Sequence, residues 1–183
     1  MVPHHSFYFL RHGETDWNRE GRLQGLRDIP LNATGEAQAE RARAAAEALG
    51  LKSIAVSSLS RARRTAEIVN RDLGLATMPF DTLREFDVGP FEGSTDGAWI
   101  ADWWAGRPVV GPETMEDFSR RVVAGLTEAL RLDHPVLVVA HGGVFWALQR
   151  ILGFEAFVDI SNAAVARFDP PVASGAPWRI ALV

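Results

Sequence analysis

The sequence predicts an α/β fold built around a largely parallel sheet. Short apolar segments alternate with longer segments of helical pattern along the 183 residues. One segment, Pro135–Ala140 (PVLVVA), is apolar almost throughout, as a strand covered on both faces requires. The hydrophobic fraction of 47% and the charged fraction of 23% are ordinary globular values, so we expect one domain over residues 1–183.

The first part of the chain predicts two strands around one helix. Phe7–Leu10 is short, aromatic and bounded by polar residues, which indicates a buried strand. An Ala/Glu/Arg-rich helix is expected from Thr34, as N-cap, to Leu49, and Gly50 stands where a left-handed C-terminal residue belongs. Ser53–Ser57 is the second short strand.

A second helix and a candidate strand continue this alternation. The helix is expected from Ser60 to about Leu73, because Ala62, Ala66 and Val69 form an apolar stripe. Thr77–Phe80 follows it as a candidate strand.

The second half of the chain predicts two more helices and further strands. Thr114 should begin a helix, because Asp117 stands at the third position of a capping-box pattern. After the strand Pro135–Ala140, a helix is expected over Val144–Leu152 and ends at Gly153. Two late segments are expected to be strands, Ala164–Phe168 and Trp178–Val183.

Cationic and imidazole side chains follow three of the expected strands. Arg11 and His12 come directly after the first strand, and Arg61 follows the second. His141 comes directly after Pro135–Ala140. Because ligands of such sheets bind beyond the carboxyl ends of the strands, these four side chains should gather at one edge. Guanidinium groups match phosphate oxygens, so the pattern predicts a phosphate site there.

The chemistry of such a site needs a nucleophile and an acid. The sequence contains no Walker-type loop and no dense aspartate cluster, so we expect side chains alone to meet the phosphate charge, with no cofactor and no metal. An uncharged imidazole is a competent nucleophile, and neighbouring guanidiniums disfavour its protonation. The loop Leu83–Gly93 offers Glu85, Asp87 and Glu92 as proton donors, and spacing alone does not choose among them.

Several stretches of the sequence occur in an order that resembles a known family. They are LRHGETDWN, LQGLRDIPLNATGEAQA, SSLSRARRTAE, LREFDVGPFEG and VVAHGGV. Together they resemble the histidine phosphatase superfamily, the phosphoglycerate mutase-like proteins. Glu14–Thr15 and His141–Gly142 stand where the acid-histidine branch carries Arg-Pro and His-Asp, so the chain looks like the other branch, branch 1. The resemblance implies a three-layer α/β/α fold with a mostly parallel central sheet.

The resemblance also implies roles for individual residues. It makes His12 the nucleophile that becomes a phosphohistidine, and it gives Glu85 the position of the general acid. The remaining implied roles are phosphoryl binding by Arg11, Arg61 and His141, assistance from Asn18, and substrate contact by Gln24.

The tryptophan-rich stretch AWIADWWAG has two readings. Trp99 and Trp103, like Ile100 and Trp104, are four residues apart, so on a helix they form two adjacent apolar ridges. These ridges either pack against the core or form an aromatic lid over the site, with Trp99 and Trp103 contacting substrate. The lid would favour aromatic or partly apolar phosphate esters.

The leading functional hypothesis is a metal-independent phosphomonoester phosphatase. The alternatives are a cofactor-dependent phosphoglycerate mutase and a non-catalytic protein that binds a phosphorylated ligand. Mutases of the family carry Arg-His-Tyr directly after the acid glutamate, whereas this chain has Phe86, Asp87 and Val88.

The bulk properties narrow the class of partner. A net charge of −4 disfavours nucleic acid, and no apolar run is long enough for a membrane span. The N-terminus lacks the pattern of a secretory signal, and the chain has no cysteine. We therefore expect a cytoplasmic protein that acts on a small phosphate ester; its oligomeric state does not follow from the sequence.

Overall fold

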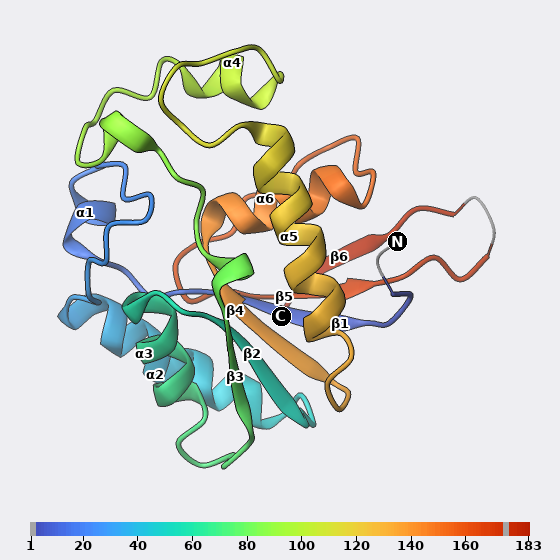
Figure 1. Cartoon of the computed structure of the whole chain (residues 1–183). Coiled ribbons are helices and arrows are strands. Elements are labelled where there is room, and N and C mark those ends of the chain that lie inside the picture. The colour runs from blue at the N-terminus through green and yellow to red at the C-terminus, as the bar shows by residue number, and fades with distance from the viewer. Residues whose placement is uncertain (1–2, 174–175) are drawn as a thin grey trace.

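The computed structural model describes residues 3–173 and 176–183 and contains a mixed sheet that is mostly parallel (Figure 1). Its six strands are β1 (Phe7–Arg11), β2 (Ser53–Ser57), β3 (Thr77–Phe80), β4 (Val136–Ala140), β5 (Val165–Asp169) and β6 (Arg179–Leu182). They lie in the order β3-β2-β4-β1-β5-β6, and only β5 and β6 join antiparallel to their neighbours. The predicted α/β class with a mostly parallel sheet is confirmed. That residues 1–183 form one domain stays a prediction.

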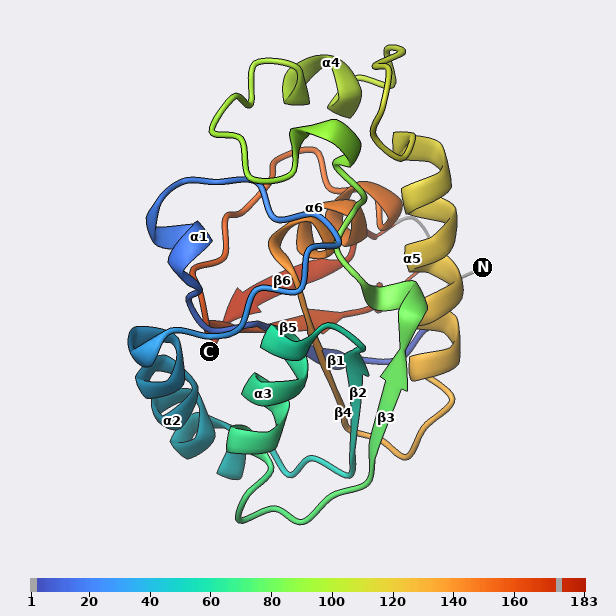
Figure 2. The same ribbon diagram turned by 60° about the vertical axis from the view of Figure 1, so that its left-hand side comes forward.

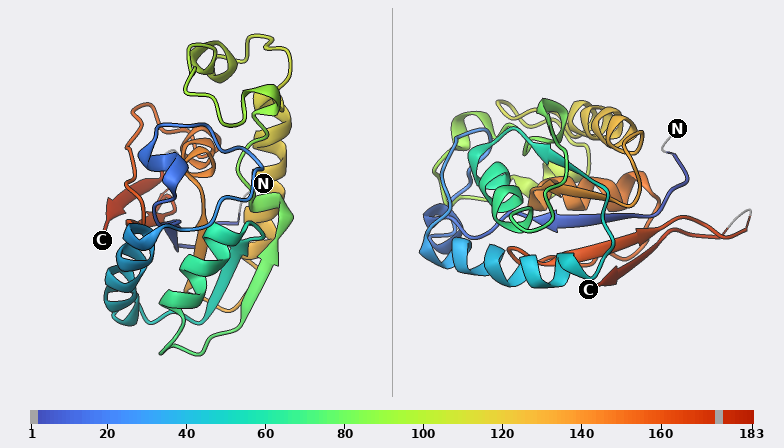
Figure 3. Two further views of the ribbon diagram at one scale, coloured as in Figure 1. Left: turned by 90° about the vertical axis from the view of Figure 1, so that its left-hand side faces the viewer. Right: turned by 90° about the horizontal axis from the view of Figure 1, so that it is seen from below.

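Helices cover both faces of this sheet, in three layers (Figures 1 and 3). One face packs against α2 (Ala33–Glu47) and α3 (Ser60–Val69), and the other against α5 (Met115–Ala129) and α6 (Gly142–Ile151). Short α1 (Asp16–Arg19) and α4 (Ile100–Trp104) belong to the loops at one end of the sheet, and Figure 2 shows α4 standing over that end. The 3₁₀ turns Asp81–Leu83 and Gly89–Phe91 lie in the loop after β3.

The central strands are buried on both faces, as their apolar runs predict. Phe9 and Val138 point into the core under α5 and α6, while Leu10 and Val139 point into the core under α2 and α3. All of them have no exposed surface. Such two-sided burial fixes the register of β1 and β4, and with it the positions of the residues that follow these strands.

Some predicted helix ends were wrong. Asn32, not Thr34, caps α2, because the side-chain carbonyl oxygen of Asn32 accepts a hydrogen bond from the Gly35 N–H at 2.8 Å. Helix α3 ends at Val69 rather than near Leu73, because the Asn70 side chain bonds both the N–H and the C=O of Leu75 at 2.8 Å and closes a turn there.

Other boundaries agree more closely. Helix α6 begins at Gly142, two residues before the predicted start at Val144. Gly50 and Gly153 have φ angles of 63° and 78°, in the left-handed region expected of residues that end helices. Across residues 3–173 and 176–183, no helix combines the length and apolar character that a bilayer crossing requires.

Candidate active site

The parallel strands bring their following residues to one edge of the sheet. Strands β1 and β4 are neighbours, and the His12 N–H donates to the Ala140 carbonyl at 2.9 Å, directly beside His141. Arg61 enters from the first turn of α3, which follows β2. Of the four side chains predicted to meet, Arg11, His12 and Arg61 line a cavity of about 210 Å³, and His141 is buried beside His12.

His12 is held as a neutral base, and its second ring nitrogen has no hydrogen-bond partner among the described residues. Its side chain is 3% exposed, and its Nδ1 lies 2.7 Å from the Gly13 carbonyl oxygen. Because a carbonyl only accepts hydrogen bonds, Nδ1 carries the proton and Nε2 keeps its lone pair. Burial, assisted by the positive charges of Arg61 and Arg11, holds the pKa of His12 well below its usual value.

A glycine is required directly after this histidine. A Cβ on Gly13 would lie 2.4 Å from the Gly35 carbonyl oxygen at the start of α2. The Gly13 N–H donates to Thr65 Oγ1 at 3.0 Å, and Thr65 Oγ1 in turn donates to the Arg61 carbonyl at 2.7 Å. These contacts lock the turn after β1 against α2 and α3, and so fix the direction of the His12 ring.

Two guanidiniums supply the positive charge. Arg61 is 1% exposed and donates to the carbonyls of Arg27 and Gly25 at 2.9 and 3.0 Å, and Arg11 donates to the Ile160 carbonyl at 2.8 Å. Burial lowers the pKa of Arg61 to about 10, so the group stays protonated at neutral pH. In the part of the chain that the structure describes, both Nε atoms are buried without an acceptor. A buried donor without a partner is costly, and an anion in the cavity would satisfy both.

His141 adds a third donor of this kind. Its Nε2 lies 2.7 Å from Ser57 Oγ, which also accepts a hydrogen bond from the Leu59 N–H at 3.4 Å. The Ser57 hydroxyl can therefore donate its proton to Nε2 of His141. Since Nε2 then accepts, the ring proton of His141 lies on Nδ1, which is buried and has no partner among the described residues. The ring centroids of His12 and His141 are 5.1 Å apart. Burial and Arg61 lower the pKa of His141 well below its usual value.

Among the three candidate acids, the structure brings only Glu85 into the wall of the cavity. Its Oε2 accepts a hydrogen bond from the Gly143 N–H at 3.0 Å, and burial raises its pKa above the usual value. Asp87 instead accepts from the Gly89 N–H at 2.7 Å, and Glu92 pairs with Arg27 at 3.3 Å. The protonated carboxyl that a proton donor needs is favoured at Glu85.

An arginine that sequence reasoning missed holds the Glu85 loop. Arg121 of α5 forms a two-pronged ion pair with Glu113 at 3.0 and 2.7 Å. It also donates to the carbonyls of Thr82, Arg84 and Glu85 at 3.1, 2.8 and 3.1 Å. Arg121 and Glu113 are remote from the loop in sequence and carry no motif, so no local signal marks them.

The polar residues predicted beside the phosphate also line the cavity. Asn18 completes a capping box with Thr15, the N-cap of α1: its Oδ1 accepts hydrogen bonds from the N–H and the hydroxyl of Thr15 at 3.2 and 3.1 Å. This leaves the Asn18 amide nitrogen as the group available to a ligand. Gln24 is buried in the same wall, and its Oε1 lacks a partner among the described residues.

Trp99 and Trp103 both pack against the core, and Trp103 also lines the cavity. Trp103 lines the cavity and is stacked on Phe86 at a centroid distance of 4.4 Å. Trp99 is not part of the cavity wall, and instead stacks on Phe91 at 4.7 Å. In the described part of the chain, no cluster of three or more His, Asp or Glu side chains is arranged to hold a metal ion.

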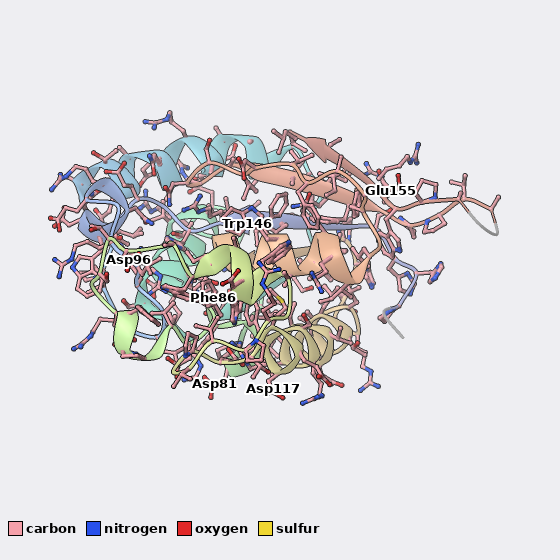
Figure 4. All side chains as sticks on the ribbon, turned by 90° about the horizontal axis from the view of Figure 1, so that it is seen from above. Asp81, Phe86, Asp96, Asp117, Trp146 and Glu155 are labelled. Carbon is pink, nitrogen blue, oxygen red and sulfur yellow. The ribbon has the colours of Figure 1, made fainter. Side chains whose placement is uncertain are left out.

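The cavity wall also contains apolar residues that were not predicted to contact substrate. Phe86, Val88, Leu23, Ile100 and Trp146 face the cavity from different segments of the chain. Figure 4 looks onto this end of the molecule and shows Phe86 and Trp146 near its centre. The cavity therefore combines a cationic floor with a largely apolar rim.

Comparisons with known proteins agree with this arrangement. Residues 7–170 match the histidine phosphatase superfamily (branch 1). The chain is 36% identical to a probable phosphoglycerate mutase GpmB of Klebsiella pneumoniae over 190 residues, covering 92% of this chain and 88% of that protein. A similar protein of Salmonella paratyphi A is 36% identical over 180 residues, covering 88% of this chain and 83% of the relative.

Solved structures give the same result for the fold. A phosphoglycerate mutase from Thermus thermophilus superposes with a TM-score of 0.77 at 32% identity, covering 98% of this chain and 99% of that one. A structure described as mycobacterial hydrolase 1 superposes with a TM-score of 0.79 at 28% identity, covering 97% and 96%. The fold is thus phosphoglycerate mutase-like, as predicted.

Proposed function

This chain belongs to the histidine phosphatase superfamily (branch 1), and we propose that it hydrolyses phosphate monoesters through a phosphohistidine at His12. The observation that carries the proposal is a set of three buried donors beside His12 that have no acceptor among residues 3–173 and 176–183: Arg11 Nε, Arg61 Nε and His141 Nδ1. Three donors suit the three equatorial oxygens of a phosphoryl group in transfer.

The first step forms the phosphoenzyme. His12 Nε2 attacks phosphorus in line, the N–P bond forms, and the bond from phosphorus to the ester oxygen breaks. The departing oxygen takes the proton of Glu85, whose raised pKa keeps that proton available. Because the guanidiniums carry the charge that develops on the phosphoryl oxygens, this step needs no metal ion.

The second step releases phosphate. Glu85, now a carboxylate, takes a proton from a water molecule that attacks phosphorus from the side the leaving group has vacated. The N–P bond breaks, and inorganic phosphate and neutral His12 are regenerated. Glu85 therefore acts as acid and then as base, and it ends the cycle protonated.

Mutase activity is the second candidate, because relatives carry the name phosphoglycerate mutase. A phosphoglycerate would require a cation for its carboxylate. Where the mutases carry Arg-His-Tyr, this chain has Phe86 and Val88 buried in the cavity wall and Asp87 bonded to the Gly89 N–H. Arg22 also lines the cavity, where it forms a partly exposed ion pair with Glu20 at 3.2 Å. These residues favour hydrolysis.

The test compares both activities in one preparation. Phosphate release from phenyl phosphate is measured beside the interconversion of 2- and 3-phosphoglycerate primed with 2,3-bisphosphoglycerate, with His12→Ala as the blank. We expect phosphate release, negligible interconversion and acid-labile phosphorylation at His12. If interconversion is faster than phosphate release, the mutase becomes the leading hypothesis. If neither reaction is detected, the protein is a non-catalytic binder of a phosphorylated ligand.

A further inference from the structure

An exposed group of aromatic rings lies beside the mouth of the cavity. It consists of Trp104, Trp146 and Phe157, which we call the aromatic shelf. The Trp104 ring meets Trp146 and Phe157 edge to face, at centroid distances of 6.3 and 5.3 Å. Trp146 is 38% exposed and Phe157 is 45% exposed. Apolar side chains that are in contact and open to solvent mark binding surfaces more often than isolated ones do.

The aromatic shelf continues the apolar wall of the active-site cavity. Trp146 lines the cavity together with Ile100 and Trp103, and the Trp103 ring lies 6.3 Å from Trp104. On its other side, Trp146 borders a polar hollow that contains Asp159. A continuous row of rings thus leads from the cavity out to Phe157.

Two charged residues next to the aromatic shelf, Arg150 and Asp159, form hydrogen bonds with it. Arg150 lies over the Trp104 ring at 5.5 Å and donates to the Trp104 carbonyl at 2.9 Å. Asp159 accepts a hydrogen bond from Trp146 Nε1 at 3.3 Å, which also holds the Trp146 ring in place. The exposed surface of the aromatic shelf itself consists of rings, which suit an apolar ligand.

We propose that the aromatic shelf binds the distal part of the substrate's leaving group, and that the substrates are phosphate esters of extended apolar or aromatic alcohols. This proposal rests on the proposed function. In that function the phosphoryl group lies at His12, and the ester oxygen lies at Glu85, on the side of the apolar rim. Continuity with the cavity favours this occupant over a second copy of the chain.

The test measures binding without turnover. The probes are straight-chain alkylphosphonates of two to eight carbons, whose C–P bond the proposed mechanism does not cleave, and their Kd values are measured by calorimetry. Each methylene that reaches the wall or the aromatic shelf should lower Kd by about fourfold. Phe157→Ala should weaken octylphosphonate by about tenfold and leave ethylphosphonate unchanged.

Met78→Ala is the matched control, because Met78 is 46% exposed but lies on the edge strand β3, outside the cavity wall. It should leave the whole series unchanged. Equal affinity across the chain lengths, failure of every phosphonate to bind, or an unchanged Kd for octylphosphonate in Phe157→Ala would overturn the proposal. A wild-type dimer that Phe157→Ala dissociates, with Kd values unaltered, would assign the aromatic shelf to self-association.

Failure of the proposed function gives a different result. In that case phenyl phosphate would release no phosphate, while the dependence of Kd on chain length and on Phe157 would persist. The calorimetry and the phosphate assay therefore separate the two proposals.

Discussion

Replacing Gly143 with alanine should disable the acid and leave the phosphate site in place. The Gly143 N–H binds Glu85 Oε2 at 3.0 Å. A Cβ at this position would lie 2.2 Å from Glu85 Oε1 and 2.7 Å from Phe86 Cδ1, whereas ordinary contacts begin at 3.4 Å. The carboxyl group must therefore retreat by about 1 Å, and a misplacement of that size can lower a rate by about 10²-fold.

The loss should depend on the leaving group. An alkoxide needs the proton of Glu85, whereas 4-nitrophenolate departs without it. Removal of a general acid typically costs about 10²–10⁴-fold, and Glu85→Gln sets this upper limit. We expect Gly143→Ala to slow alkyl phosphates by about 10²-fold and 4-nitrophenyl phosphate much less.

The assay is phosphate release across a series of alkyl and substituted phenyl phosphates, with thermal melting as the check on folding. Gly142→Ala is the neighbouring control, since its Cβ would lie 3.5 Å from the Arg11 guanidinium, an ordinary contact. Any loss in Gly142→Ala should be equal for all leaving groups. An equal loss across the series in Gly143→Ala would refute the role of Glu85 as the acid.

Three further predictions concern metal dependence, pH and the support of the acid loop. Exhaustive chelation should leave phosphate release unchanged, because guanidiniums carry the phosphoryl charge; a strict requirement for added magnesium would contradict this. Burial raises the pKa of Glu85, so above the ordinary pKa of a glutamate the native state retains a proton that the unfolded chain has lost. The free energy of unfolding should therefore fall as pH rises from that ordinary pKa to the raised pKa of the native state. Scanning calorimetry should therefore show Glu85→Gln gaining stability relative to wild type as pH rises above the ordinary pKa of a glutamate, and no relative gain would place the proton elsewhere. Arg121→Lys keeps the charge but loses the two-pronged pair with Glu113 and the carbonyl contacts. The kcat for alkyl phosphates should therefore fall by roughly tenfold, with KM little changed. An equal loss of kcat for 4-nitrophenyl phosphate would indicate a merely structural role.

The sequence predicted the sheet and the cationic floor of the site because both depend on local patterns. The strands Ser53–Ser57 and Thr77–Phe80 have the predicted bounds, since short apolar or β-branched runs between polar residues identify strands by themselves. Arg11, His12 and His141 follow strands that the sequence marks as buried, and parallel pairing necessarily brings such positions to one edge.

Only the tertiary structure distinguished Glu85 from Asp87 and Glu92 by contact, because of these three carboxyl groups it is Glu85 that accepts a hydrogen bond from the N-terminus of α6. The same holds for the rim of the cavity. Trp103 lines it and Trp99 does not, although both lie on the same predicted ridge. The direction of a side chain at the edge of a core is set by elements that pack against it from distant parts of the sequence, and no local spacing records those contacts.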